Sequence, residues 1–392
     1  MVSNRMNRTS RSFRILSEEP FRIFFPTGLF LGMVGVSLWL LFYFGAGIPY
    51  PGTSHARLMI EGFMGSFVLG FLGTAGPRIL SASPLSLREL GSIFTLDLLA
   101  AGFHASDAHK VGDVCFAACL LVFLCAGANR FRKRKECPPP NFALVILGFL
   151  CGISGAALVA YSESAQYSGL YQFGNALLDQ GFILLPVLGI SPFFLARLLE
   201  LPQPDLPESR AFPAGWFRQA GFAALIGVVI IASFLIDIFN LPRTAGCVRL
   251  GAIAIYLAVR MPFRGRNFLA NCLRAGIISI LLGLTVAVLW PDYRIGALHV
   301  VFITGFSFII FTVAIRVIFG HSGNAMLFQK RLPFLIISGL LLVVAMLSRV
   351  TAELSPRARI VHLVAAAVCW LLASLIWMAK VIPKVAVTEP DA

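Results

Sequence analysis

The sequence predicts an all-α fold: a polytopic helical membrane protein with about twelve transmembrane helices, forming a single membrane domain over residues 1–392. Composition is the first reason. Hydrophobic residues make up 58% of the chain, charged residues only 13%, and the mean hydropathy is +0.85, whereas a soluble domain carries about 25% charged residues. Run length is the second. Apolar stretches such as 28–43, 142–160 and 332–346 can cross a hydrocarbon core of roughly 30 Å, and no alternating pattern suggests a barrel.

The individual spans are the apolar runs between charged residues and Pro or Gly residues. They are expected at 24–47, 57–76, 88–106, 111–128, 142–161, 171–198, 215–237, 244–260, 270–290, 296–319, 333–350 and 359–379. The longest connection, 199–214, is a Pro-rich loop. No segment is long and polar enough to form a soluble domain, and no convincing internal repeat appears.

Charge predicts the orientation. The segments assigned to the inner side hold most of the basic residues, as the positive-inside rule requires: Arg5, Arg8, Arg11, Arg14, Arg22, Arg130 to Lys135, Arg260, Arg264, Arg266 and Arg274. The loop 162–170 has none. Residues 1–23 are then a basic cytoplasmic segment and 380–392 a cytoplasmic tail. The first apolar run is too long for a signal-peptide core, so we expect it to be retained.

The net charge of +14 raises the question of nucleic acid. Because the basic residues lie between apolar spans, the expected partner is the anionic surface of the lipid bilayer, and no nucleic acid is expected.

Five of the six histidines are expected near the outer face. They are His55, His104, His109, His299 and His362. Imidazole is the commonest protein ligand of metals and haem, so this grouping points to a buried metal or haem centre. His321 falls on the inner side, about 33 Å along one helix from His299, and these two cannot ligate the same ion.

His55 and Met59 lie one helical turn apart, and imidazole and thioether groups both ligate haem iron or copper. Ordinary packing of a buried Met beside a His is the alternative. Glu61 is a functional candidate because a carboxylate at membrane depth needs a reason to be there. Its alternative is an exposed interfacial pair with Arg57 at i,i+4 spacing. Asp97 lies two turns from His104 and could flank the same polar cavity.

Several segments in order resemble the NnrS family of bacterial integral membrane proteins. They are PFRIFF at 20–25, HARLM at 55–59 with GF at 62–63, GFLGTA at 70–75 closed by Pro77, PFF at 192–194, and RVIFGHSG at 316–323 in the span that His299 opens. The resemblance runs through nearly the whole chain. It implies about twelve spans, an association with haem and copper, and resistance to nitric oxide.

The chain departs from the family's first motif, which reads His-x-His-Glu-Met. Arg57 replaces the second His and Leu58 the Glu, and a guanidinium cannot ligate a metal. Asn324 stands where the family has Arg after the Gly-His-Thr-Gly segment. The resemblance implies haem b, with copper as a second metal. His55 and His299 are then the expected metal ligands, Met59 or His104 the axial or second-metal candidates, and His321 an inner ligand or a helix cap.

Two classes of function follow. The first is a haem-bearing membrane protein that relieves nitrosative stress, with nitric oxide or a related small molecule as its partner; whether it is an enzyme stays open. The second is a transporter or a metal or haem conduit that uses the intramembrane carboxylates Glu61, Asp97 and Asp179. Broken helices would favour this second class, and Pro186 is the clearest place for a break. A divergent member without its metal site is a third reading.

Overall fold

The computed structural model describes residues 14–162, 169–199, 210–261 and 267–387. Every regular element within these residues is helical, with no strand among them, so the predicted fold class is confirmed. Among the predicted basic positions, Arg5, Arg8, Arg11, Arg264 and Arg266 lie outside the described residues, as do residues 388–392 of the tail.

Ten helices in the described part of the chain are long and apolar enough to cross a membrane. Seven of them are α2 (Phe21–Tyr43), α6 (His109–Arg132), α7 (Phe142–Ser162), α10 (Trp216–Ile238), α12 (Phe268–Leu289), α15 (Pro333–Leu354) and the helix Pro356–Val385, formed by η7 (Pro356–Ala358) and α16 (Arg359–Val385). The other three, Gly52–Ile79, Gly169–Leu198 and Pro291–Gly320, are each built from several segments. All ten coincide with predicted spans, and the chain is therefore a multi-pass membrane protein.

The two remaining predicted spans are also helices. They are α5 (Leu87–Ala105) and α11 (Pro242–Arg260), each of 19 residues. Charged side chains lower their hydropathy: Arg88, Glu89 and Asp97 in α5, and Arg243, Arg249 and Arg260 in α11. At 1.5 Å per residue each helix is about 28 Å long, which matches a hydrocarbon core. Their crossing of the membrane stays a prediction.

Each of the three composite helices contains a segment of π-helix. The Gly52–Ile79 helix runs through α3 (Gly52–Arg57), η1 (Leu58–Gly65) and α4 (Ser66–Ile79). The Gly169–Leu198 helix runs through α8 (Gly169–Ala176), η3 (Leu177–Gly181) and α9 (Phe182–Leu198). The Pro291–Gly320 helix runs through η4 (Pro291–Tyr293), α13 (Arg294–His299), η5 (Val300–Ser307) and α14 (Phe308–Gly320). π-Helical segments occur frequently at functional sites.

A Gly-Phe pair recurs in or at the end of all three π-helical segments: Gly62-Phe63, Gly181-Phe182 and Gly305-Phe306. The three phenylalanines are 0–1% exposed. Pro186, the clearest place for a break, lies within the continuous helix α9, and the π-helical segment η3 precedes it in the same span. These segments stay helical and are not unwound.

The described chain divides into two compact units. Of the described residues, the first unit comprises 14–28, 60–162, 169–189 and 210–224, and the second comprises 29–59, 190–199, 225–261 and 267–387. Among the described residues, the boundaries between the two units fall within four helices: α2, η1, α9 and α10. The prediction of a single domain stays a prediction.

In the first unit α6 packs against α5 and α7, and α7 packs against α8 and η3. Glycines permit the close approach of α7. A Cβ on Gly152 would lie 2.8 Å from the Phe182 ring, and one on Gly155 would lie 2.7 Å from the backbone nitrogen of Leu178. Small residues at this position therefore allow close helix packing.

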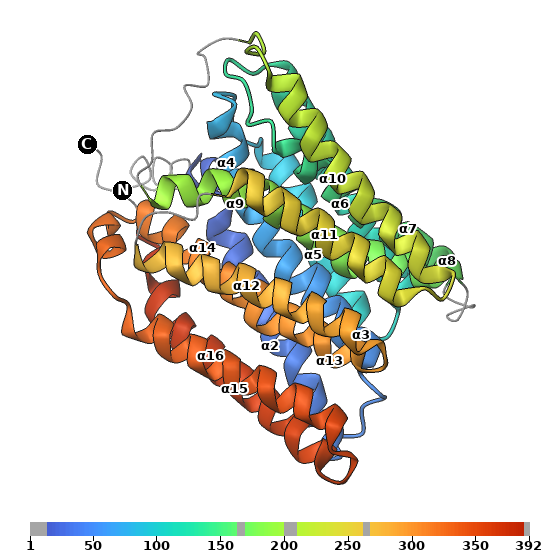
Figure 1. Cartoon of the computed structure of the whole chain (residues 1–392). Coiled ribbons are helices and arrows are strands. Elements are labelled where there is room, and N and C mark those ends of the chain that lie inside the picture. The colour runs from blue at the N-terminus through green and yellow to red at the C-terminus, as the bar shows by residue number, and fades with distance from the viewer. Residues whose placement is uncertain (1–13, 163–168, 200–209, 262–266, 388–392) are drawn as a thin grey trace, which may run out of the picture. The chain divides into compact units, whose positions relative to one another are not determined.

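In the second unit α15 and α16 form an antiparallel pair, and α12 packs against α11, α13, η5 and α14 (Figure 1). A Cβ on Gly283 of α12 would lie 2.8 Å from the Ala297 carbonyl oxygen, so only glycine lets α12 approach the segment that carries His299. The short helix η6 (Ala325–Gln329) follows α14. The indole nitrogen of Trp377 donates to the Phe311 carbonyl oxygen at 3.2 Å and ties α16 to α14.

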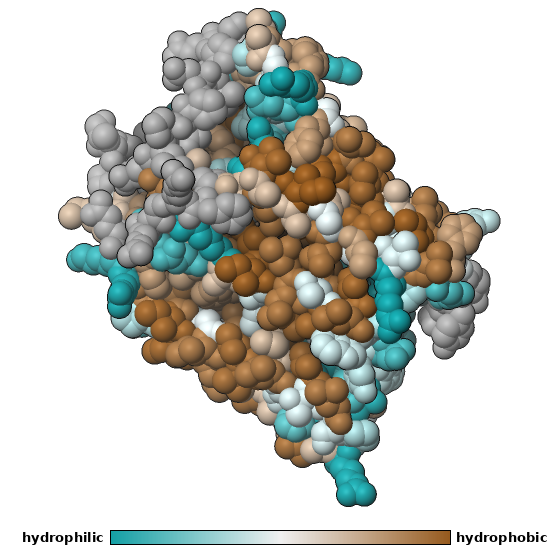
Figure 2. All heavy atoms as spheres, viewed as in Figure 1, coloured by the Kyte–Doolittle hydropathy of each residue, from teal (hydrophilic) through white to brown (hydrophobic). Residues whose placement is uncertain are grey.

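The outward-facing surfaces of the long helices are apolar. Phe30, Leu225, Ile278, Leu340 and Val361 are each more than 60% exposed. Figure 2 shows apolar residues covering most of the helical surface in this view, with hydrophilic residues gathered mainly towards helix ends. Exposed apolar area of this extent suits contact with lipid rather than water.

Candidate functional site

His55 is fixed by a neighbouring helix of the second unit. It lies in α3, directly before η1, and its Nδ1 is 3.0 Å from the Gly35 carbonyl oxygen of α2. Gly35 makes this approach possible, because a Cβ there would lie 3.0 Å from the Leu58 Cβ. The ring of Trp39 packs edge-on against the imidazole at 5.9 Å between centroids. The His55 side chain is half-buried.

Met59 follows one turn later and is also half-buried. Its sulfur would lie 3.6 Å from a Cβ on Gly35, so the thioether lies against the part of α2 that holds His55. The structure therefore places this predicted pair on one side of the helix, as the i,i+4 spacing indicated.

His299 is the last residue of α13, directly before η5. Its Nδ1 is 2.7 Å from the Ile295 carbonyl oxygen, and Phe302 packs edge-on against its ring. The helix that carries it is held by Glu353 of α15, whose Oε2 accepts from the Gly296 backbone N–H at 2.9 Å. The other Glu353 oxygen pairs with Arg349 at 3.1 Å.

His55 and His299 both belong to the second unit. Each ring directs Nδ1 at a backbone carbonyl oxygen. An Nδ1–H that donates in this way leaves the lone pair on Nε2, which is the usual arrangement of a metal-binding imidazole. No described residue hydrogen-bonds to either Nε2.

The donor set in the second unit fits haem and copper. It contains two half-buried imidazoles with oriented Nε2 atoms and one thioether sulfur, which are the ligand types that haem iron and copper accept. Both histidines directly precede a π-helical segment. Their assignment as ligands remains a prediction.

His104 belongs to a different cluster, in the first unit. It is 0% exposed, and its Nε2 is 2.9 Å from Glu61 Oε2. Its Nδ1 is 3.4 Å from His109 Nδ1, and the two rings stack with centroids 5.7 Å apart. His109 Nε2 in turn contacts Asp107 Oδ1 at 2.8 Å. Both ring nitrogens of His104 therefore have partners, which argues against its use as an axial haem ligand.

Asp113 completes this cluster and was not singled out in the sequence. It lies on α6, is 1% exposed, and places Oδ1 3.9 Å from His104 Nε2. The one available signal was its i,i+4 spacing from His109. Gly112 admits the His104 ring, because a Cβ at that position would lie 2.6 Å from Nε2.

Asp97 is buried, as its position within a span predicts, with an exposed fraction of 1%. Its Oδ2 accepts from the Ser66 hydroxyl at 2.7 Å. Its Oδ1 has no hydrogen-bond partner among the described residues. Asp97 also lies within electrostatic range of Glu61, so both predicted intramembrane carboxylates belong to one buried polar region.

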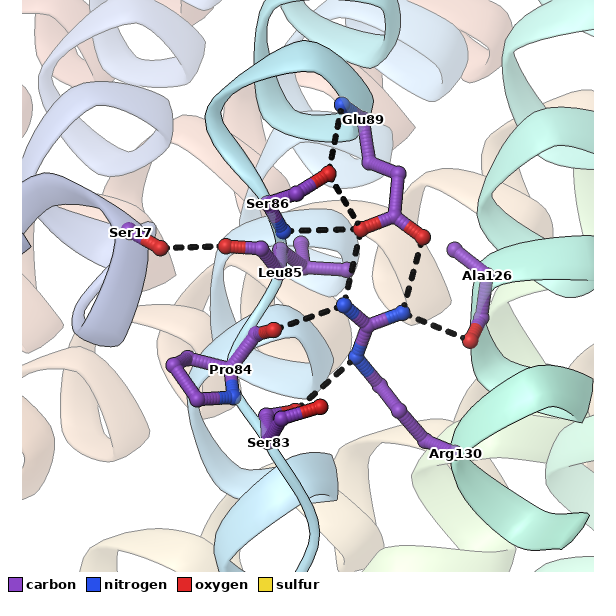
Figure 3. A network of polar contacts seen from close by, with 8 residues as sticks. All are labelled: Ser17, Ser83, Pro84, Leu85, Ser86, Glu89, Ala126 and Arg130. Atoms are coloured by element: carbon purple, nitrogen blue, oxygen red, sulfur yellow. Dashed lines mark hydrogen bonds and ion pairs between the residues drawn. The ribbon is translucent and has the colours of Figure 1, made fainter. Parts of the chain in front are cut away.

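Arg130 fixes the other end of the α5–α6 hairpin. Its guanidinium directs five N–H groups at five acceptors (Figure 3): Glu89 Oε1 and Oε2 and the carbonyl oxygens of Ser83, Pro84 and Ala126, at 2.6–3.0 Å. Glu89 also forms a capping box with Ser86 at the start of α5. Arg130, assigned from sequence to a basic cytoplasmic loop, is therefore a buried structural residue.

The exposed Arg57–Glu61 pair considered from the sequence is wrong. Arg57 is 2% exposed and Glu61 1%, so neither is an interfacial side chain in water. Arg57 therefore belongs to the interior of the protein. A buried guanidinium needs compensating polar interactions.

Three further polar residues of the second unit, His321, His362 and Asp237, contact neighbouring groups. His321 Nδ1 lies 2.7 Å from the Val317 carbonyl oxygen at the end of α14, the same kind of contact that His299 makes with Ile295, so its role as an inner ligand or a helix cap stays a prediction. His362 lies against the Ser348 hydroxyl. Asp237 pairs with Arg249 at 2.7 Å and with Arg294 at 3.2 Å.

A comparison with protein families decides the identity. The family described as NnrS protein matches residues 15–387, nearly the whole chain. The chain belongs to the NnrS family. No curated protein sequence matches it. Membership agrees with the resemblance, and it makes Arg57 and Leu58 departures from the motif within a true member.

Proposed function

We propose that this NnrS-family protein holds haem b, with copper as a second candidate metal, and protects the cell against nitric oxide and nitrosative stress. One observation carries the proposal. His55 and His299, which are far apart in sequence, lie in one unit with Nδ1 turned to a backbone carbonyl oxygen and with no hydrogen bond from a described residue to Nε2. The family membership supports it.

His55 and His299 would hold the haem, and Met59 is the thioether candidate for copper. Fixing Nδ1 on the main chain sets the tautomer and the ring orientation, so little reorganisation accompanies ligation. When bound, haem supplies an iron centre that takes diatomic gases and exchanges electrons.

The surrounding side chains would shape this site. Trp39 covers one side of the His55 ring and limits access of water. Arg349, held by Glu353, places a positive charge near both imidazoles. A fixed cation favours anionic groups on whatever binds there.

Two versions of the protective function fit this arrangement. Nitric oxide is turned over at the centre, which makes the protein an enzyme, or cellular iron is protected without turnover. The proposed location is the bacterial inner membrane, with both termini in the cytoplasm, as the distribution of basic residues predicts.

A second function has its own support. In the first unit a chain of contacts leads from Asp107, whose side chain is 61% exposed, through His109 and His104 to the buried Glu61. Buried ionisable groups in series are typical of transporters and ion conduits. Loss of the metal site is a third candidate, and the replacement of the motif's second His by Arg57 supports it.

Visible absorption and metal analysis of the purified protein test the proposal. A Soret band with iron near one atom per haem is expected, and cells that lack the protein should grow more slowly after a nitric oxide pulse. Consumption of nitric oxide by the purified protein would separate turnover from protection. A colourless, metal-free protein would refute the proposal and leave the second and third candidates.

A further inference from the structure

The cluster of Glu61, His104 and Asp113 in the first unit has the form of a metal site that is separate from the His55–His299 pair. One ligand atom from each of the three side chains lies within 4.8 Å of the other two. The three come from three helices, η1, α5 and α6. All three are at most 1% exposed, so the cluster is not a solvated acidic surface.

The contacts of His104 fix which of its nitrogens faces the carboxylates. In the neutral form of His109 that donates Nε2–H to the exposed Asp107 at 2.8 Å, Nδ1 is the acceptor atom of the ring. His104 Nδ1 then donates to it across 3.4 Å. His104 Nε2 remains to face Glu61 and Asp113, in the orientation that metal-binding histidines take when a partner holds the other nitrogen.

The turn between α5 and α6 supports this chain of contacts. Asp107 has φ +65°, a left-handed conformation that Asp adopts more readily than most residues. The carboxylate of this same residue contacts His109, two residues later in the chain. Gly112 serves the same end, because any side chain there would displace the His104 ring.

The spacing also suits an ion. Bonds of about 2.0–2.2 Å from a first-row metal to imidazole nitrogen and carboxylate oxygen put neighbouring ligand atoms roughly 3–3.6 Å apart. The observed separations from His104 Nε2 are 2.9 Å to Glu61 and 3.9 Å to Asp113. Small side-chain adjustments would bring all three atoms onto one ion.

We propose that Glu61, His104 and Asp113 bind one divalent first-row transition metal ion, such as Zn²⁺, Fe²⁺ or Mn²⁺. Two carboxylates balance its charge, and the imidazole favours a transition metal over Mg²⁺ or Ca²⁺. The absence of thiolate or thioether sulfur from these three ligands disfavours Cu⁺.

Zn²⁺ binding to the purified full-length protein tests the site. After chelator treatment and dialysis, calorimetric titration and elemental analysis should find one tightly bound Zn²⁺ that is lost in His104→Gln, Glu61→Gln and Asp113→Asn. Asp107→Asn should weaken binding by about tenfold, since it removes the group that orients the two imidazoles. The matched control is Asp292→Asn, an exposed carboxylate, which should leave binding unchanged.

The melting temperature distinguishes a variant that fails to fold from a folded variant that has lost the metal site. Removal of Zn²⁺ should lower it in the wild-type protein and not in folded variants of the three ligands. Equal Zn²⁺ affinity in wild type and His104→Gln, or no stoichiometric binding by wild type, would overturn the proposal.

The two metal proposals fail independently. His55→Ala should lose haem and keep the Zn²⁺ site. His104→Gln should lose the Zn²⁺ site and keep the Soret band.

Discussion

The contacts of Arg130 permit a quantitative prediction about stability. Replacing Arg130 with Gln removes a bidentate ion pair with Glu89 and three hydrogen bonds to carbonyl oxygens. Breaking a buried ion pair costs roughly 3–5 kcal/mol. The Glu89 side chain is 27% exposed, so water recovers part of this loss, and we expect about 3 kcal/mol.

Thermal unfolding in detergent measures this loss. For a chain of this size we expect the melting temperature to fall by about 5 °C. Arg132→Gln is the matched control, because Arg132 is exposed in the same final turn of α6; it should change the melting temperature by about 1 °C or less. Equal melting temperatures for the two variants would refute the structural role of Arg130. A double-mutant cycle with Glu89→Gln should show a coupling of about 1–3 kcal/mol.

The remaining predictions concern the haem site and the topology. Glu353→Gln weakens the hold on the Gly296 N–H and should lower the haem content at constant protein level; unchanged absorbance per protein would contradict this. If Arg57 replaces a lost ligand, Arg57→His should raise the haem and copper content and His55→Ala should abolish it, whereas equal haem and copper content in the two variants would show that the motif is not part of the site. A reporter fused to the C-terminus and active only in the periplasm should be inactive; an active one would overturn the orientation and the outer placement of the histidines.

Hydropathy was sufficient to predict the helices. Ten predicted spans coincide with long apolar helices. A helix needs about 20 apolar residues to cross the hydrocarbon core, so a run of this length is a reliable sign of a transmembrane helix. The π-helical segments were not predicted, since they disturb neither length nor composition. The Gly-Phe pairs at 62, 181 and 305 are no signal of them, because the same pair also occurs in α-helix at 70, 102, 148 and 221.

Side-chain partners were predicted less well. Sequence spacing identified Glu61 and Asp97 as buried carboxylates, but Glu61 contacts His104 across 43 residues, a separation that no helical period encodes. Asp113 was missed for the same reason. The burial of Arg130 was not predicted, because positive-inside statistics count charges and do not distinguish a solvated arginine from one with five internal acceptors.

The haem content of histidine variants tests the central claim most directly. His55→Ala and His299→Ala should each lose the Soret band while remaining folded and membrane-inserted, because each removes one of the two oriented Nε2 atoms. His362→Ala, a histidine that lies against Ser348, should keep the full band. A wild-type Soret band retained in both His55→Ala and His299→Ala would contradict the assignment of this pair as the haem ligands.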